Sequence, residues 1–144
     1  MVIAVIGCGR IAQNAHFPAL AKIEGLRVKY ACDLLIEKAE LMKEKYEMVE
    51  NAITDYQIAL ADPEVEAVFV LTPNFAHYTV TMDALRADKH VFCEKPVDLT
   101  PEKVQAVIEE GFDGMNHFII KQAGRLSVEQ HRIISQPHLP RYIR

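Results

Sequence analysis

The sequence has few of the residues that build covalent or metal-based frameworks. Only three cysteines occur among its 144 residues, Cys8, Cys32 and Cys93, and no two of them have CxxC spacing. An odd number of cysteines without that spacing suggests neither a disulfide framework nor a zinc site. Free thiols are typical of a reducing compartment, so the sequence predicts a cytoplasmic protein.

Long hydrophobic runs and an excess of positive charge are also missing. No apolar run approaches the roughly 18 residues that a membrane-spanning helix needs, and the N-terminus lacks the basic start and long apolar stretch of a signal peptide. The net charge of −4 gives no reason to expect nucleic acid as a partner. We therefore predict neither a membrane nor a nucleic-acid partner.

The charge that is present is divided unevenly along the chain. Of the 16 Lys and Arg residues, five lie after residue 114, where only one of the 20 Asp and Glu residues is found. The composition changes near residues 111–114. We therefore expect a domain at 1–110 and an atypical basic tail at 111–144, with at most one strand at 117–120 and one helix at 127–135.

Buried-strand patterns alternate with helix-like segments over most of the chain. We expect strands at 2–6, 27–32, 47–50, 65–71 and 90–93, and helices at 10–23, 34–45, 54–62, 75–87 and 100–111. Pro18 should kink or break the first helix. This βαβ alternation predicts an α/β fold, a Rossmann-type doubly wound parallel sheet in a single domain.

Polar or glycine-rich segments follow four of the predicted strands. They are Gly7-Cys8-Gly9, Asp33, Thr72-Pro73-Asn74 and Glu94-Lys95-Pro96. Ligands of such sheets collect at the carboxyl ends of the strands. We therefore expect the four segments to meet at one edge of the sheet, which we call the rim.

The glycine-rich segment fits the pattern G-x-G-x-x-A, formed by Gly7, Gly9, Arg10, Ile11 and Ala12. The first glycine permits a tight turn, the second lets a pyrophosphate approach the backbone, and the small third residue lets helix and strand pack closely. Free N–H groups at the start of the helix would face the phosphates. The alternative is a glycine-rich turn that binds no ligand.

Asp33 stands at the end of the second predicted strand, at about the distance from the glycines at which an acid reaches the adenosine ribose. A carboxylate there would accept from both hydroxyls and repel a 2′-phosphate. Leu34 and Leu35 supply no cation for such a phosphate, so NAD is favoured over NADP. The alternative role for Asp33 is a helix N-cap.

Three further side chains near the rim have chemical potential. Lys95 could polarise a carbonyl or relay a proton, and Glu94 could orient it or bind a ribose hydroxyl. The alternative for Lys95 is an ordinary surface Lys-Pro at the start of a loop. His77 lies three residues after Asn74, and its spacing favours a ring satisfied by a nearby carbonyl over a ligand contact.

Three stretches of sequence together resemble the Gfo/Idh/MocA family of NAD(P)-dependent oxidoreductases. They are GCGRIAQNAHFPAL, ACDLLIEKAE and ITDYQIALADPEVEAVFVLTPNFAHYTVTMDALRADKHVFCEKP. The TPNxxH turn followed by a helix, a strand and EKP is more specific than the glycine motif. The resemblance covers residues 1 to about 103, the dinucleotide-binding half of the family.

The resemblance implies a role for each rim segment. Gly7, Gly9 and Ala12 would form the pyrophosphate turn and Asp33 would bind the adenosine ribose, while Thr72, Pro73, Asn74 and His77 would line the cofactor cleft. Glu94 would sit near the nicotinamide, and Lys95 would assist hydride and proton transfer at a sugar or polyol carbon. The Lys95–Pro96 bond is expected to be cis.

The resemblance does not extend to the family's second domain, which supplies most of the substrate pocket. The last strand of the dinucleotide domain is also hard to find, with 117–120 a poor candidate. We therefore expect a truncated, cofactor-binding chain that is inactive alone. One alternative is a non-catalytic nucleotide-binding or oligomerisation module, in which a homodimer covers an open sheet edge near the strand at 90–93. The other is a small oxidoreductase completed by a neighbouring subunit.

Overall fold

A computed structural model of the chain describes residues 1–113 and 118–120, with the side chains described up to residue 111. The strands are β1 (Val2–Ile6), β2 (Arg27–Cys32), β3 (Val49–Ile53), β4 (Ala67–Val70), β5 (His90–Cys93) and β6 (Phe118–Ile120). The helices are α1 (Phe17–Leu20), α2 (Ile36–Lys45), α3 (Tyr56–Ala61), α4 (Asn74–Arg86) and α5 (Pro101–Asp113).

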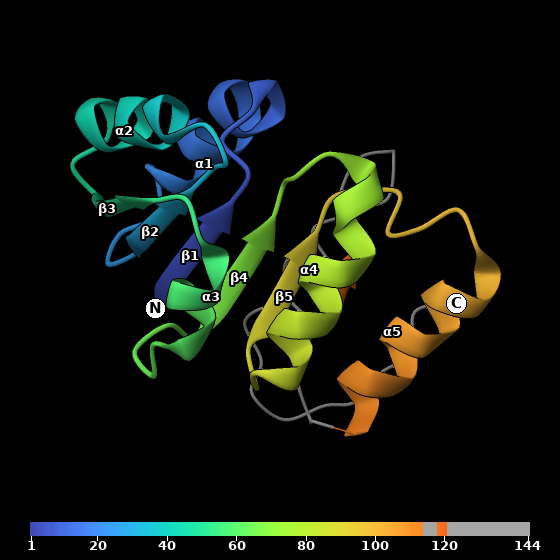
Figure 1. Ribbon diagram of the computed structural model, residues 1–144. Helices are drawn as coiled ribbons and strands as arrows, with labels where there is room; N and C mark the ends of the chain where they lie inside the picture. Colours follow the sequence, from blue (N-terminus) through green and yellow to red (C-terminus); the bar gives the residue numbers. More distant parts are fainter. Residues whose placement is uncertain (114–117, 121–144) are drawn as a thin grey trace.

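The six strands form one parallel sheet in the order β3-β2-β1-β4-β5-β6, and Figure 1 shows the part from β3 to β5. β1 and β4 are neighbours in the middle of the sheet, and their pairing runs from Ile3↔Ala67 to Ile6↔Val70. The strand order reverses between them. A crevice for a ligand forms outside the carboxyl ends of the strands at such a switch point. The predicted Rossmann-type doubly wound sheet is confirmed.

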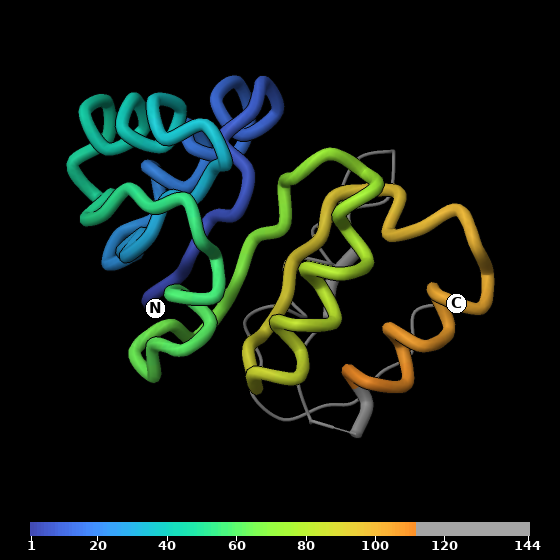
Figure 2. Tube along the Cα trace, viewed as in Figure 1, coloured from blue at the N-terminus to red at the C-terminus, as the bar shows by residue number. Residues whose placement is uncertain are grey.

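Helices cover both faces of the sheet because the central strands bury side chains on both sides (Figure 1). Alternate residues of β1 divide between two cores: Ile3 and Val5 pack with residues of α1 and α2, whereas Ala4 and Ile6 pack with residues of α3, α4 and α5. The chain trace in Figure 2 shows the same arrangement without the ribbons.

The first helix is interrupted just before Pro18, where the sequence predicts a kink or a break, and it is shorter than expected. A helical path starts at Arg10, widens into a π-helical turn over Ala12–His16 and ends with α1 at Leu20 instead of residue 23. Pro18 lies in the first turn of α1, where a missing N–H costs least. The wider turn before it therefore accommodates the proline.

Two of the expected strands also differ from the structure. The third lies at Val49–Ile53 and not at 47–50, because its register pairs Val28 with Val49. Within the poor candidate at 117–120, the described residues Phe118–Ile120 form a strand, β6, which pairs in parallel with β5 from Val91↔Phe118 to Cys93↔Ile120. β5 is therefore not the edge strand, and the sheet edge expected near it lies at β6 among the described residues. The helix expected at 127–135 lies outside the described residues.

Candidate functional site

The glycine turn after β1 is shaped by its contact with the end of β4. Gly7 has a φ of +100°, and a Cβ on it would lie 2.5 Å from both the carbonyl carbon and the oxygen of Leu71. Its N–H donates to the Cys32 carbonyl at 2.8 Å. Only glycine fits this position, because both the backbone conformation and the space exclude a side chain.

Gly9 is a glycine for a different reason. A Cβ on Gly9 would meet nothing within 4 Å, so the chain itself needs no glycine there. The open space lies where the helix begins, and the first N–H groups of a helix have no acceptors within it. Arg10 and Ile11 are exposed, whereas Ala12 is fully buried against the sheet. This geometry fits the close approach of a pyrophosphate to the backbone.

Asp33 ties the end of β2 to the glycine turn. Its Oδ2 accepts from Cys8 N at 2.9 Å, and its Oδ1 accepts from Leu35 N at 3.0 Å. The N-cap residue of α2 is Leu35, so the alternative role of Asp33 as N-cap is wrong. Each carboxylate oxygen has capacity for a second hydrogen bond, so Asp33 can still accept from ribose hydroxyls.

His77 joins the segment after β4 to the loop after β5. Its ring is 2% exposed, with Nδ1 at 2.6 Å from the Pro96 carbonyl and Nε2 at 2.7 Å from the Thr72 carbonyl. The carbonyl-satisfied ring that the spacing favours is thus what the structure shows. Pro73 is the N-cap residue of α4, which begins at Asn74.

Thr72 presents a polar atom that the described residues do not satisfy. Its Oγ1 is buried without a hydrogen-bond partner in the part of the chain that the structure describes. A buried hydroxyl of this kind costs free energy unless something hydrogen-bonds to it. It lies in the segment that follows β4, next to the glycine turn.

Glu94 is held by a residue that the sequence did not link to it. Its Oε1 lies 2.7 Å from Nε2 of His16, and both side chains are nearly buried. The two residues are 78 positions apart, and no spacing pattern in the chain signals the pair.

Lys95 is exposed at the rim. It lies between Glu94, which His16 contacts, and Pro96, whose carbonyl His77 contacts. The Lys95–Pro96 bond is cis, as the family resemblance implies. The structure therefore brings Gly7, Asp33, Thr72 and Lys95 to the ends of four strands whose order is β2-β1-β4-β5. All four predicted segments lie at the rim.

The cysteines supply no nucleophile at the rim. Burial raises the pKa of Cys8 and of Cys32 to about 12 and that of Cys93 to about 11. A thiol with so high a pKa stays protonated at neutral pH. Within the described residues there is also no group of three metal-binding side chains.

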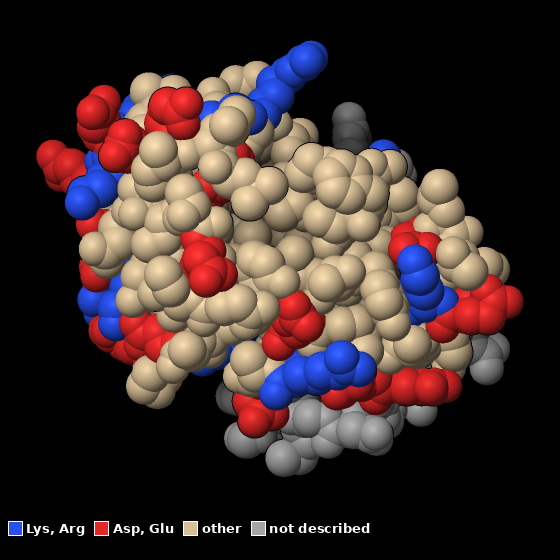
Figure 3. All heavy atoms as spheres, in the orientation of Figure 1, with Lys and Arg blue, Asp and Glu red and all other residues tan. Residues whose placement is uncertain are grey.

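The surface around the rim carries little charge. In Figure 3 a broad area without Lys, Arg, Asp or Glu covers the centre and upper right of the view, and most acidic and basic side chains gather at the upper left, at the right and along the lower margin. Three apolar side chains in the segments that follow β2, β4 and β5 are strongly exposed: Leu34, Phe75 and Leu99. Such a surface is typical of a face that binds a ligand or a partner.

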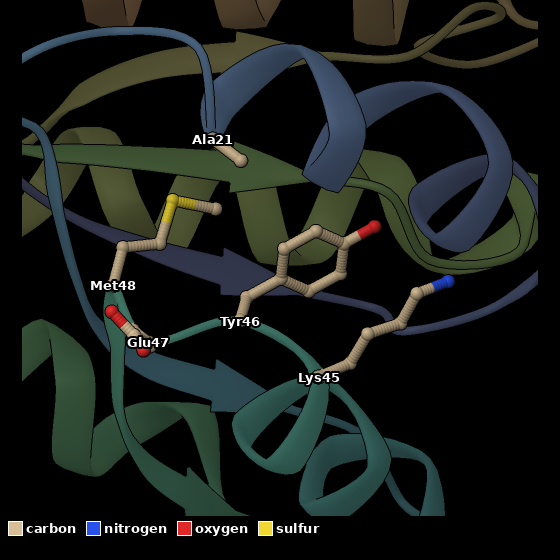
Figure 4. A pocket seen from close by; sticks show the side chains of 5 residues that line it. All are labelled: Ala21, Lys45, Tyr46, Glu47 and Met48. Carbon is tan, nitrogen blue, oxygen red and sulfur yellow. The ribbon is translucent and has the colours of Figure 1, made fainter.

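A hollow with a volume of about 350 Å³ lies away from the rim. Its lining comes from the end of the α1 segment and the connection between α2 and β3 (Figure 4): Ala21, Lys45, Tyr46, Glu47 and Met48. None of the predicted site residues lines it. Among the described residues, no helix has the length and apolar character to cross a bilayer.

Such a rim on a doubly wound parallel sheet defines a dinucleotide-binding domain. The family described as "Oxidoreductase family, NAD-binding Rossmann fold" matches residues 1–111, more than half of the chain. The chain belongs to this Gfo/Idh/MocA family, and these residues are its NAD(P)-binding domain.

Relatives of known or named activity match the same region. The chain is 36% identical over 106 residues to inositol 2-dehydrogenase of Salmonella typhimurium, which covers 73% of this chain and 31% of the relative. It is 33% identical over 149 aligned positions to myo-inositol 2-dehydrogenase of Thermotoga maritima, covering 98% of this chain and 44% of the relative. That second alignment runs past residue 111, through most of the basic tail. The chain spans about a third of the length of the first relatives.

Solved structures share the fold. A putative myo-inositol dehydrogenase from Sinorhizobium meliloti superposes with a TM-score of 0.77 at 26% identity, covering 84% of this chain and 36% of the other. KijD10, a 3-ketoreductase from Actinomadura kijaniata in complex with NADP, gives a TM-score of 0.77 at 25% identity and covers 83% and 38%. Relatives of this fold thus include one that binds NADP.

Proposed function

We propose that the rim binds NAD in preference to NADP, with Asp33 on the adenosine ribose and the pyrophosphate over Gly9. The main support for this proposal is the position of Asp33. Its Oδ2 accepts a hydrogen bond from Cys8 N, in the glycine turn, at 2.9 Å. The residue that follows, Leu34, is 90% exposed and uncharged. A fixed negative charge beside an uncharged side chain favours ribose hydroxyls over a 2′-phosphate.

The remaining rim residues fit the rest of the dinucleotide. The backbone at Arg10 and Ile11 would face the pyrophosphate, while Thr72, Pro73, Asn74 and His77 would line the cleft between the strands. The unsatisfied Oγ1 of Thr72 supports this assignment, since a bound ligand can hydrogen-bond to it. Glu94 would stand near the nicotinamide.

The chemistry follows from what each part contributes. Bound nicotinamide accepts or gives a hydride. Lys95, exposed after β5, would orient a carbonyl or alcohol oxygen of a sugar, polyol or related substrate and move a proton at that oxygen. Lys95 is therefore the proposed catalytic residue.

We expect the 144-residue chain to bind the cofactor without oxidising a polyol. The described residues place one acid–base side chain, Lys95, exposed at the rim, and orientation of a substrate in a water-excluded site is a large part of catalysis. The homologues match this chain over only part of their length. The residues that enclose a substrate would come from a further domain or subunit.

The test is a titration of the purified chain with NADH and NADPH, followed by nicotinamide fluorescence. Asp33→Ala should weaken NADH binding at least roughly tenfold, because it removes charge-assisted hydrogen bonds to ribose and to Cys8 N. Asp33→Asn is the matched control, since it preserves the shape and an acceptor for Cys8 N. Equal NADH binding by wild type and Asp33→Ala would show the assignment of Asp33 to be wrong.

A gain-of-function variant tests the cofactor preference directly. Leu34→Arg places a guanidinium beside the site proposed for the ribose and should improve NADPH binding relative to NADH. Leu34→Gln controls for added polarity without charge. A wild-type chain that already binds NADPH as tightly as NADH would contradict the preference.

A homodimer remains a proposal for the exposed apolar surface. Phe75 and Leu99 are 84% and 85% exposed at the rim and could be covered by a second copy. Sedimentation at increasing protein concentration checks this, and a monomer at all concentrations would contradict it.

A further inference from the structure

Two buried histidines reach the loop after β5 from opposite faces of the sheet. His16 ends the π-helical turn before α1, and His77 lies in the first turn of α4. The residues of α1 and α4 belong to the two separate cores on the two faces (Figure 1). The loop residues that they contact, Glu94 and Pro96, stand immediately before and after Lys95.

The contact of His16 is fixed by aromatic packing. Nε2 of His16 lies 2.7 Å from Oε1 of Glu94, and both residues are 8% exposed. The imidazole packs edge-on against the ring of Phe92 at 5.5 Å and that of Phe69 at 6.3 Å, and these two rings stack on each other at 4.9 Å. The histidine ring therefore has little room to turn, and it holds Glu94 in one place.

The contact of His77 is fixed at both ends of its ring. Nδ1 meets the Pro96 carbonyl at 2.6 Å and Nε2 meets the Thr72 carbonyl at 2.7 Å. A neutral ring donates one of these bonds and a doubly protonated ring donates both. The ring contacts both carbonyls and so lies between the segment after β4 and the loop after β5, but only a doubly protonated ring hydrogen-bonds to both.

We propose that His16 and His77 are positioning residues that together hold residues 94–96, so that the backbone carrying Lys95 has its working position before any ligand binds. One histidine fixes the side chain before Lys95, and the other fixes the carbonyl after it. This inference rests on the proposed function, which assigns the nicotinamide end of the cofactor to this loop.

Because the loop is already ordered, cofactor binding loses less conformational entropy. Fixing the backbone of a loop residue costs conformational entropy, and a loop already held by two buried side chains has met that cost in folding. Contacts between residues 94–96 and the nicotinamide then contribute fully to affinity. Loss of either histidine should weaken the nicotinamide contacts and leave the adenosine contacts intact.

Paired variants separate the hydrogen bonds from the packing. His16→Phe keeps an aromatic ring against Phe69 and Phe92 but cannot bond to Glu94, whereas His16→Gln keeps a donor. His77→Leu removes both carbonyl contacts, whereas the amide of His77→Gln has two N–H donors. Thermal melts by circular dichroism establish which variants fold. If the variant of one histidine does not fold, the variants of the other histidine still test the proposal.

The ligands are NADH and ADP-ribose, which lacks the nicotinamide and reports on the glycine turn and Asp33 alone. His16→Phe and His77→Leu should weaken NADH binding roughly fivefold to tenfold, the size of a lost hydrogen bond, and change ADP-ribose binding by less than about twofold. The glutamine variants should restore most of the NADH affinity. Equal losses for both ligands, or no loss for either, would overturn the proposal.

Hydrogen exchange in the unliganded chain gives a second readout that does not depend on the cofactor. The Glu94 amide donates to the Val70 carbonyl at 3.0 Å and should exchange slowly in the wild type. His16→Phe and His77→Leu should speed exchange in residues 94–99 at least roughly fivefold while β1 and β4 stay protected. Unchanged exchange in the loop of the variants would overturn this proposal, whether or not the wild type binds either ligand. A wild-type chain that binds neither ligand would refute the proposed function instead.

Discussion

The two ends of the sheet use polar residues in opposite ways. At the amino end, charged side chains pair with one another: Arg27 bonds to Glu50 and Glu64 at 2.7 Å each, and Lys29 pairs with Asp62 at 2.6 Å and also with Glu64. At the rim, charged or polar groups such as Asp33 and His77 bond to backbone, and among the described residues no partner is found for the Oγ1 of Thr72 or for the ammonium of Lys95.

This difference indicates which end was shaped by a ligand. The network at the amino end is complete within the chain and lowers the pKa of Asp62 to about 2, chiefly through its bond from Lys29. The rim holds an empty space over Gly9 and a buried hydroxyl that no described residue satisfies. Features that cost stability persist where they serve another purpose.

The largest expected effect is on folding, at the glycine that joins β1 to the end of β4. Gly7→Ala would place a Cβ 2.5 Å from the Leu71 backbone at a φ of +100°. Because backbone atoms cannot move aside cheaply, we expect a loss of about 3 kcal/mol or more in the free energy of unfolding. Urea denaturation measures it, and a loss below about 1 kcal/mol would contradict the close contact.

The matched variant at the other glycine should separate stability from binding. Gly9→Ala meets no atom within 4 Å, so the midpoint of thermal unfolding should hardly change. The added methyl group would occupy the space proposed for the pyrophosphate and should weaken NADH binding roughly tenfold. Parallel melts and titrations check both halves, and undiminished NADH affinity would place the phosphates elsewhere.

The sequence predicts the rim better than it predicts how the rim is held. Gly7, Asp33, Thr72 and Lys95 follow strands whose apolar runs are unambiguous, and parallel strands bring their carboxyl ends to one edge. The pair of His16 and Glu94 depends on a π-helical turn and on contacts across 78 residues, which no local pattern encodes. β6 is also hard to predict because it has only three residues, Phe118–Ile120, and becomes part of the sheet by pairing with β5.

A smaller effect is expected from the amino end of the sheet. The pKa of Asp62 is lower in the folded chain than its usual value, so the stabilisation from Lys29 is present at neutral pH and is lost as the pH falls towards about 2. Lys29→Met should therefore lower the melting temperature at pH 7, and its difference from wild type should shrink in acid. NADH affinity at pH 7 should stay the same, and a clear loss would show that the two ends are coupled.

Among the residues of the rim, the smallest effect on cofactor binding is expected at the residue proposed for catalysis. Lys95 is exposed, and the loop that carries it is held through its neighbours Glu94 and Pro96 and not through its own side chain. Lys95→Ala should therefore change NADH affinity by less than roughly threefold, because it removes a group whose proposed partner is the substrate. Titration beside Asp33→Ala, with Lys95→Arg as the charge-preserving control, measures this. A loss for Lys95→Ala as large as that for Asp33→Ala would mean that the ammonium binds the cofactor itself, and its role would shift from proton transfer to cofactor recognition.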